Sequence, residues 1–232
     1  MSSLGLALDI PRIVLYFDDG AWKDGWVADN LSSRKEETMV RSLAWAMVLG
    51  GCLAPALGHA PAAANPVKSL YTTVELRKCK RVNRHRDGGA WLCNGLAGLQ
   101  VYVAEGDLRQ FLSVGSDPQK RRAATQTLGA FNSIFERGSN RATIEWRFNR
   151  RGERQVPYAV IVRFHTSQEG RRGDVLVVSK VSPTETCHVA YIDALANSDA
   201  ITLARLVADK QAKAFDCRNE PHTEGATGNS PM

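Results

Sequence analysis

Residues 142–148 alternate apolar and polar side chains with a period of two, and Ile144, Trp146 and Phe148 occupy the apolar positions. This spacing predicts a strand with one buried and one solvated face. Similar extended segments follow it, separated by turns rich in Gly and Arg, which predicts an antiparallel meander. The strands expected in this half cover residues 142–148, 157–164, 175–178 and 187–194.

The first half carries a weaker form of the same pattern. A turn signal at Arg86-Asp87-Gly88-Gly89 predicts a hairpin between strands at 71–82 and 90–93. Gly95 and Gly98 then bracket a tight connection, and Gly106 lies in a further turn. We therefore expect the meander to include two more short strands here, at 99–103 and 108–114.

Two segments have helical character. Residues 116–137 begin with Asp117-Pro118 and good helix formers, which predicts a short helix and then an irregular link. Its expected apolar anchors are Leu128, Phe131, Ile134 and Phe135. Further on, Asn197 or Ser198 should cap an amphipathic helix that runs to about Phe215.

The predicted fold class is α+β: a mainly antiparallel sheet, arranged as a meander, with the C-terminal amphipathic helix packed on it. Residues 65–217 should form this single domain. Residues 218–232 are rich in Pro, Gly, Ser and Thr, and we expect them to be a disordered tail.

Residues 39–64 have the three parts of a secretory signal peptide. Arg41 supplies a basic start, Leu43 to Leu57 is an uncharged run, and Ala62-Ala63-Ala64 supplies a cleavage site before Asn65. A transmembrane helix needs about 20 apolar residues, so this run is short for an anchor. The sequence thus predicts a periplasmic or secreted protein without a transmembrane helix after processing. A buried core helix is the alternative interpretation of the run.

A signal peptide belongs at an N-terminus, yet residues 1–38 precede this one. Lys35-Glu36-Glu37 is encoded by purines alone, as a ribosome-binding site would be, and it lies just before Met39. We therefore expect residues 1–38 to be an over-extended 5′ reading frame. The alternative is a genuine N-terminal region with a strand at Ile13 to Phe17.

The cysteines agree with export. Removing the leader takes Cys52 from the five cysteines and leaves an even set, as in disulfide-bonded exported proteins. Cys52 also ends a lipobox-like Leu49-Gly50-Gly51-Cys52, so a lipoprotein anchored through Cys52 is the alternative. A hairpin centred on residue 86 places Cys79 opposite Cys93. A helix that folds back on the last strand brings Cys217 beside Cys187.

The charge of the exported part is basic. Residues 1–64 hold five of the 30 basic and seven of the 24 acidic residues, so the remainder has a net charge of +8. Two turns carry arginines, whose forked guanidinium suits phosphate and carboxylate. In an exported protein this favours an anionic envelope polymer or an acidic protein over nucleic acid as the partner. The candidate anion-binding residues are Arg150, Arg151, Arg154, Arg171 and Arg172.

The sequence contains none of the G-x-S-x-G, H-E-x-x-H, Walker A, G-x-G-x-x-G or C-x-x-C motifs, and its histidines lack metal-ligand spacing. We expect no metal and no cofactor. The absence of catalytic motifs favours a non-catalytic binding or interaction module. The alternative is a periplasmic hydrolase with an unrecognised site, for which Glu145, Asp193 and His165 are the candidate carriers.

Overall fold

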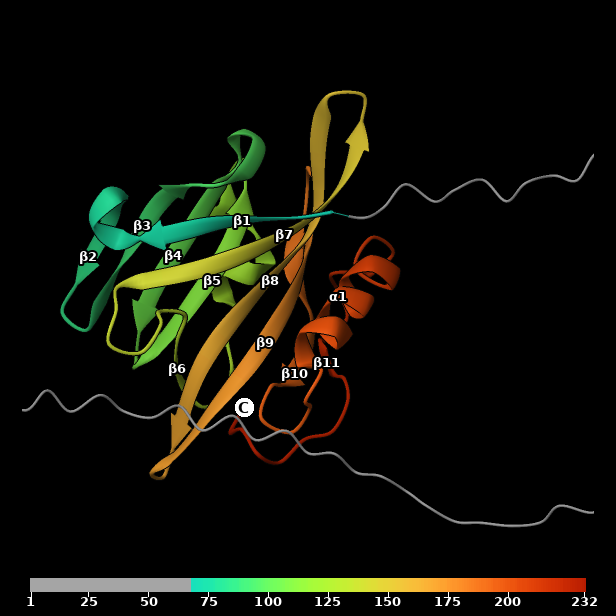
Figure 1. Ribbon diagram of the computed structural model, residues 1–232. Helices are drawn as coiled ribbons and strands as arrows, with labels where there is room; N and C mark the ends of the chain where they lie inside the picture. The colour runs from blue at the N-terminus through green and yellow to red at the C-terminus, as the bar shows by residue number, and fades with distance from the viewer. Residues whose placement is uncertain (1–67) are drawn as a thin grey trace, which may run out of the picture. The chain divides into compact units, whose positions relative to one another are not determined.

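The computed structural model describes residues 68–232, which form two β-sheets and one α-helix (Figure 1). The first, sheet A, is ordered β1-β7-β8-β9-β10-β11, with β6 paired to β8. The second, sheet B, is ordered β2-β3-β4-β5. Sheet A consists of β1 (Lys68–Glu75), β6 (Phe131–Ser133), β7 (Arg141–Arg151), β8 (Arg154–Gln168), β9 (Arg171–Val181), β10 (Thr186–Asp193) and β11 (His222–Thr223). Sheet B consists of β2 (Lys80–His85), β3 (Gly88–Asn94), β4 (Gln100–Gly106) and β5 (Arg109–Gly115).

The expected α+β class, mostly antiparallel with one helix, is confirmed. Sheet A is mixed, because β11 runs parallel to β10 while the other pairs are antiparallel. The leader, the upstream segment 1–38 and Cys52 lie outside the described residues. Within residues 68–232, no helix has the length and apolarity needed to cross a membrane.

Two hydrophobic cores lie on opposite faces of sheet A. Val160, Val162 and Phe164 of β8 pack towards sheet B. The alternating residues Ala159 and Ile161 pack towards the helix. Figure 1 shows sheet B and the helix on opposite sides of β8 and β9. Both faces of β8 are therefore buried. The solvated face predicted for β7 is wrong, because Glu145 and Arg147 on that face are also buried.

The first strand departs from the prediction. Residues 71–82 were expected to form one strand, but a 3₁₀ turn at Leu76–Lys78 divides them between β1 and β2. β1 pairs with β7, Thr72 opposite Ile144, whereas β2 pairs with β3. The chain therefore crosses from sheet A to sheet B at this turn, and the predicted single meander becomes two sheets.

The segment 116–137 contains no α-helix, contrary to prediction. It forms 3₁₀ turns at Pro118–Lys120 and Arg122–Thr125, followed by β6. Arg121 interrupts the helical path with extended backbone, and its guanidinium donates to the Pro183 carbonyl at 3.0 Å. Tertiary hydrogen bonds thus outweigh the local helix preference. Leu128 and Ile134 are buried as expected, but Phe131 is 42% exposed.

The helix α1 spans Ala200–Lys210 and is shorter than predicted at both ends. Ala204, Val207 and Ala208 are buried in the core that it shares with β8, β9 and β10. Ile201, an apolar residue in the first turn of the helix, is 37% exposed.

Both expected disulfides are present. Cys79 and Cys93 join with a Cα–Cα distance of 4.5 Å, and Cys187 and Cys217 with one of 5.7 Å. In the β2–β3 hairpin Lys80 pairs with Leu92, which sets Cys79 opposite Cys93 as the sequence predicted.

The tail is ordered, so its predicted disorder is wrong. Residues 222–223 form β11, and the backbone N–H groups of Asn229 and Ser230 both donate to Asp193 Oδ2 at 2.8 Å. Met232 packs against the core between the sheets. These contacts could not be predicted from the polar composition of the tail, because they are backbone hydrogen bonds to one buried carboxylate.

Candidate anion-binding site

The two arginine turns lie at opposite ends of β8. Arg151 pairs with Arg154 where β7 turns into β8, and Gln168 pairs with Arg171 where β8 turns into β9. Figure 1 shows these hairpins at the two ends of the long strands. The five arginines therefore cannot form one site, and each turn must be considered by itself.

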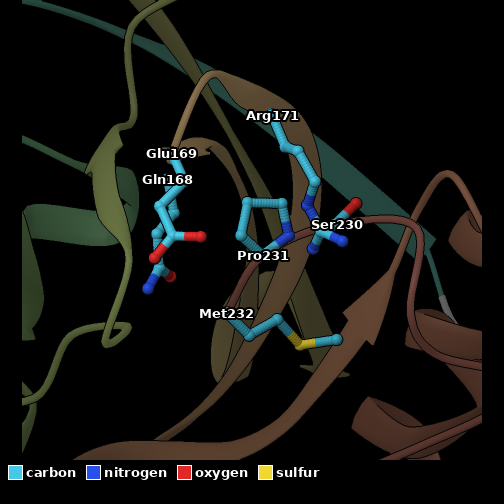
Figure 2. Close-up of a pocket in the computed structure, with 6 residues that line it drawn as sticks. All are labelled: Gln168, Glu169, Arg171, Ser230, Pro231 and Met232. Carbon is cyan, nitrogen blue, oxygen red and sulfur yellow. The ribbon is translucent and has the colours of Figure 1, made fainter.

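The two arginines of the second turn, Arg171 and Arg172, also lie in different clefts. Arg171 lies in a cleft of about 440 Å³ with Ser230, Pro231 and Met232, and Figure 2 shows it beside the tail. Arg172 pairs with Ser167 and points to the other face of the sheet. Only Arg172 lines the cleft that also contains His165.

This second cleft, of about 350 Å³, is basic. Its side chains come from the β6–β7 connection and from the paired ends of β8 and β9. Two of them are arginines, Arg137 and Arg172, and a third is His165. The residues that line it are Arg137, Gly138, His165, Thr166, Ser167 and Arg172.

Asp174 fixes the basic groups. His165 and Asp174 are direct cross-strand neighbours, and Nδ1 of His165 lies 2.5 Å from Oδ1 of Asp174. Arg137 donates from Nη2 to the Gly173 carbonyl at 2.9 Å and reaches the Asp174 carboxylate at 3.4 Å. With one carboxylate and two guanidinium groups, the cluster keeps a net positive charge.

A second compartment of about 370 Å³ adjoins the basic one, since His165 and Ser167 line both. Two of the side chains that line it, Leu108 and Phe131, are apolar and exposed, and the other six are polar. Its floor is fixed by Gln110, whose side-chain oxygen accepts the Ile134 N–H at 2.8 Å. The residues that line this compartment are Glu105, Leu108, Gln110, Phe131, Asn132, Ser133, His165 and Ser167.

The register of β6, β8 and β9 aligns residues in rows across the cleft. Ser133, His165 and Asp174 are directly paired in one row, and Phe131, Ser167 and Arg172 in the next. Paired residues point to the same face of a sheet, so each row presents its side chains together. Ser133 Oγ itself donates to Gln110 Oε1 at 3.2 Å rather than to His165.

Glu145, one of the candidate catalytic carboxylates, is part of a buried ion-pair network. Its side chain is 5% exposed and accepts from Arg205 Nε at 2.7 Å. Nearby, Arg147 donates two hydrogen bonds to Asp209, at 2.9 and 2.7 Å. Burial by itself would lower the pKa of Arg147, but its hydrogen bonds to Asp209 and the nearby negative charges together raise the pKa overall. This network ties α1 to β7 and leaves Glu145 no open side for a substrate.

Asp193, another candidate catalytic carboxylate, has a structural role. It is fully buried, and its two oxygens accept four backbone N–H groups, from Leu195, Ala196, Asn229 and Ser230. Burial alone would raise its pKa, but hydrogen bonds from Ser230 and its neighbours lower it overall. The carboxylate therefore stays ionised as an anchor for the chain.

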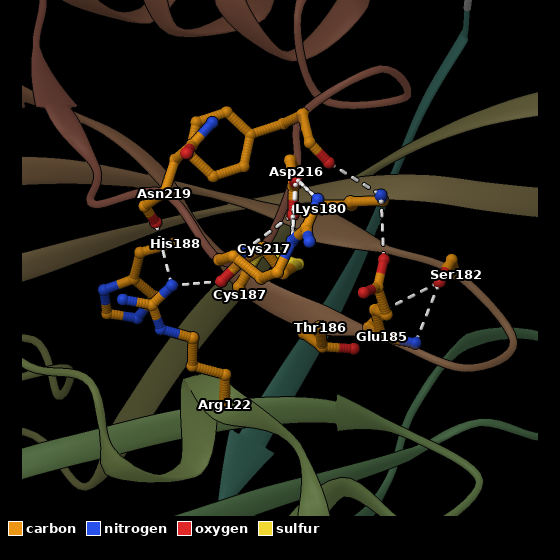
Figure 3. The surroundings of a disulfide bond; sticks show 12 residues. Arg122, Lys180, Ser182, Glu185, Thr186, Cys187, His188, Asp216, Cys217 and Asn219 are labelled. Carbon is orange, nitrogen blue, oxygen red and sulfur yellow. Dashed lines mark hydrogen bonds and ion pairs between the residues drawn. A yellow bond between two sulfur atoms is a disulfide. The ribbon is translucent and has the colours of Figure 1, made fainter.

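His188 is adjacent to Cys187, but no thiolate is available because Cys187 is disulfide-bonded. Figure 3 shows Arg122, His188 and Asn219 around this bond. Burial, together with the smaller effect of the Arg122 charge, lowers the pKa of His188 to about 3. His188 is thus a neutral core residue.

A basic strand that we did not single out from the sequence lies at the edge of sheet B. All six residues of β2 are exposed, and the run 77–86 holds six Lys and Arg residues. This run of basic residues could have been recognised in the sequence as a candidate anion-binding surface. Arg77 and Lys78 bind Glu75 there, and these contacts, Lys78 first, lower the pKa of Glu75 to about 2. The strand offers a charged surface without a cleft.

Within residues 68–232, no three His, Cys, Asp or Glu side chains are grouped so as to hold a metal ion. Comparison of the chain with protein-family models, with curated proteins and with solved structures finds no match in any of the three. The geometry of the clefts is therefore the basis on which a function can be inferred.

Proposed function

We propose that the protein is an exported binding module that holds the phosphate or carboxylate group of an anionic envelope component between Arg137 and Arg172. The observation that carries this proposal is the convergence of Arg137, Arg172 and His165 on one cleft. Guanidinium groups bind such anions through paired N–H donors, and Asp174 holds Arg137 and His165 in position. Arg150, Arg151 and Arg154, at the far end of β8, are outside this site.

The compartment is part of the proposal. Two disulfides support an oxidising environment, because such bonds persist in the periplasm and outside the cell. In this proposal residues 39–64 are the signal peptide, residues 1–38 are not translated, and the exported domain begins near Asn65. A lipoprotein anchored through Cys52 is the alternative form. An acidic protein is the alternative partner.

The test is calorimetric titration of the exported domain with inorganic phosphate. Arg137→Gln and Arg172→Gln should each weaken binding at least tenfold, because a charge-assisted contact is worth about 1.5–3 kcal/mol. Two matched controls, Arg150→Gln in the far turn and Arg84→Gln on β2, should retain the affinity of the parent protein.

Added salt should weaken binding, since exposed charges are screened over about 8–10 Å. Equal losses in all four variants, or a loss confined to Arg84→Gln, would reject the cleft as the binding site. Affinity that is indifferent to both salt and the cleft arginines would reject anion binding altogether.

The row Ser133, His165 and Asp174 supports a second candidate function, hydrolysis. Asp174 orients His165 through Nδ1, as the acid of a catalytic triad orients its histidine, and Ser133 is the next residue in the row. Turnover of p-nitrophenyl acetate, lost in both Ser133→Ala and His165→Gln while the melting temperature is kept, would establish it. Turnover that survives in Ser133→Ala would rule this assignment out.

A further inference from the structure

Leu108 occupies a strained position at the tip of the β4–β5 hairpin. Gly106 pairs with Arg109, so Asp107 and Leu108 form a two-residue loop, and their φ angles are 51° and 57°. Two-residue hairpin loops of this kind favour Asn-Gly or Asp-Gly, because both residues take positive φ. The bulky Leu108 side chain therefore costs free energy where Gly would not.

Nothing in the core of the protein compensates for this strain, because the Leu108 side chain is 68% exposed. The neighbourhood instead holds the turn in place. The Leu108 carbonyl accepts the Asn132 N–H at 3.1 Å, and Arg109 donates to the Gly129 carbonyl at 2.9 Å. Arg109 also lies over the Phe131 ring at 5.4 Å. A leucine kept exposed on a rigid, strained turn indicates a contact outside the chain.

Leu108 and Phe131 line the compartment that adjoins the basic cleft. In the row Phe131, Ser167, Arg172, the apolar and cationic ends are two strand spacings apart, roughly 10 Å. Glu105 lines the same compartment and would repel an anion there, and Arg109, which lies over the Phe131 ring, is already paired with Asp107. This arrangement favours one orientation of an amphiphilic ligand, with its charge at Arg172 and its apolar part at Leu108.

We infer that Leu108 and Phe131 form an apolar subsite, and that the ligand is an aliphatic chain that carries a phosphate or carboxylate head group. This inference rests on the anion site proposed above and adds the class of ligand to it. Each compartment lies near the lower limit of small-molecule pockets, which suits a head group in one and a short chain in the other.

The experiment titrates the exported domain with methyl, butyl and octyl phosphate and with octanoate, all below their micelle-forming concentrations. Each methylene buried on the subsite should tighten binding about threefold to fourfold. Octyl phosphate should therefore bind at least tenfold more tightly than methyl phosphate. Comparison with octanoate shows which head group the basic compartment prefers.

Leu108→Gly separates the two subsites. It should abolish the dependence on chain length and leave methyl phosphate binding unchanged, while the melting temperature rises by about 2–5 °C as the strain is relieved. Leu108→Asn, which also tolerates positive φ, should lose the dependence in the same way. Leu206→Ala removes another exposed leucine, on α1, and should keep the dependence of affinity on chain length.

The outcomes distinguish this inference from the proposed function. Methyl phosphate binding without any gain from the longer chain would overturn the apolar subsite and leave the anion site intact. A chain-length dependence that persists in Leu108→Gly would also overturn it. If methyl phosphate, octyl phosphate and octanoate all fail to bind, the anion site and the subsite both fall.

Discussion

The carboxylate of Asp193 accepts the backbone N–H of Ser230 at 2.8 Å, although 37 positions separate the two residues along the chain. The same oxygen accepts the Asn229 N–H, and the other oxygen accepts Leu195 and Ala196. One buried charge thus organises both the turn after β10 and the return of the C-terminal segment. It explains why a polar tail is ordered.

Asp193→Asn should release this tail. The amide would turn an NH₂ donor towards two N–H donors, leaving buried groups unsatisfied at about 1–3 kcal/mol each. We expect a loss of about 2–5 kcal/mol in the free energy of unfolding, measured by urea denaturation, and faster amide hydrogen exchange over residues 222–232.

Asp199→Asn serves as the control, since Asp199 is exposed and its side chain caps no N–H. Its stability should match that of the parent protein. An Asp193→Asn variant with an unchanged exchange pattern would contradict the role of Asp193 as the anchor of the tail.

His188 should make stability depend on pH. Its pKa in the folded state is about 3, against 6.5 in the unfolded chain, so only the unfolded state binds its proton between these values. The free energy of unfolding should therefore be unaffected by this group above pH 6.5 and fall by up to about 1.4 kcal/mol per pH unit below it.

The window from pH 6.5 to about 5 lies above the ordinary pKa range of carboxyl groups. His188→Asn keeps a polar atom opposite the Tyr191 hydroxyl, which lies 3.0 Å from Nδ1, but cannot titrate. Thermal denaturation of this variant should give a flatter profile across the window, although it is less stable overall. The exposed His85→Asn serves as the control, and a parent protein whose stability is constant from pH 7 to 5 would refute the prediction.

The fold could be predicted from the sequence where the determinants are local. The turn signal at Arg86 to Gly89 predicts the hairpin, but its tip pairs His85 with Gly88, and only a register shift between Arg81 and Asn83 sets Cys79 opposite Cys93. The division of residues 71–82 between two sheets could not be predicted in this way. Both parts have strand-like sequences, and the choice of partner depends on pairing with β7, which is about 70 residues away.

The candidate site shows the same limit. His165 and Arg172 were both singled out from the sequence, but for different functions, and Arg137 was not singled out. Their convergence depends on the register of β8 with β9 and on the course of the chain after β6. Such alignments place residues 7 to 35 positions apart in one cleft, and no local motif encodes them.

Glu145 and Arg205 should be energetically coupled to each other, because Glu145 is almost fully buried. We expect each of Glu145→Gln and Arg205→Gln to destabilise the protein, and the double variant to lose less than the sum of the two. The coupling energy should be about 1–3 kcal/mol, obtained from a double-mutant cycle in urea.

The exposed pair Asp216 and Arg218 provides the reference cycle. Its coupling should be smaller, because water screens exposed ion pairs. Equal coupling in the two cycles would mean that the Glu145 network does not hold α1 on the sheet.

The disulfide between Cys187 and Cys217 should contribute more to stability than any single ion pair. It closes a loop whose ends are 30 positions apart, which in the chain-entropy model is worth about 3.7 kcal/mol. Cys217→Ser should therefore lower the melting temperature by about 7–15 °C for a domain of this size. Cys79→Ser is the matched comparison, since its loop spans 14 positions and its loss should cost somewhat less in the same model.

Phosphate binding should survive in both variants at temperatures where they remain folded, because neither bond lies in the cleft of Arg137 and Arg172. A Cys217→Ser protein that melts with the parent would show that the hydrogen bonds of Arg122 and Asp193 hold this region without the covalent bond.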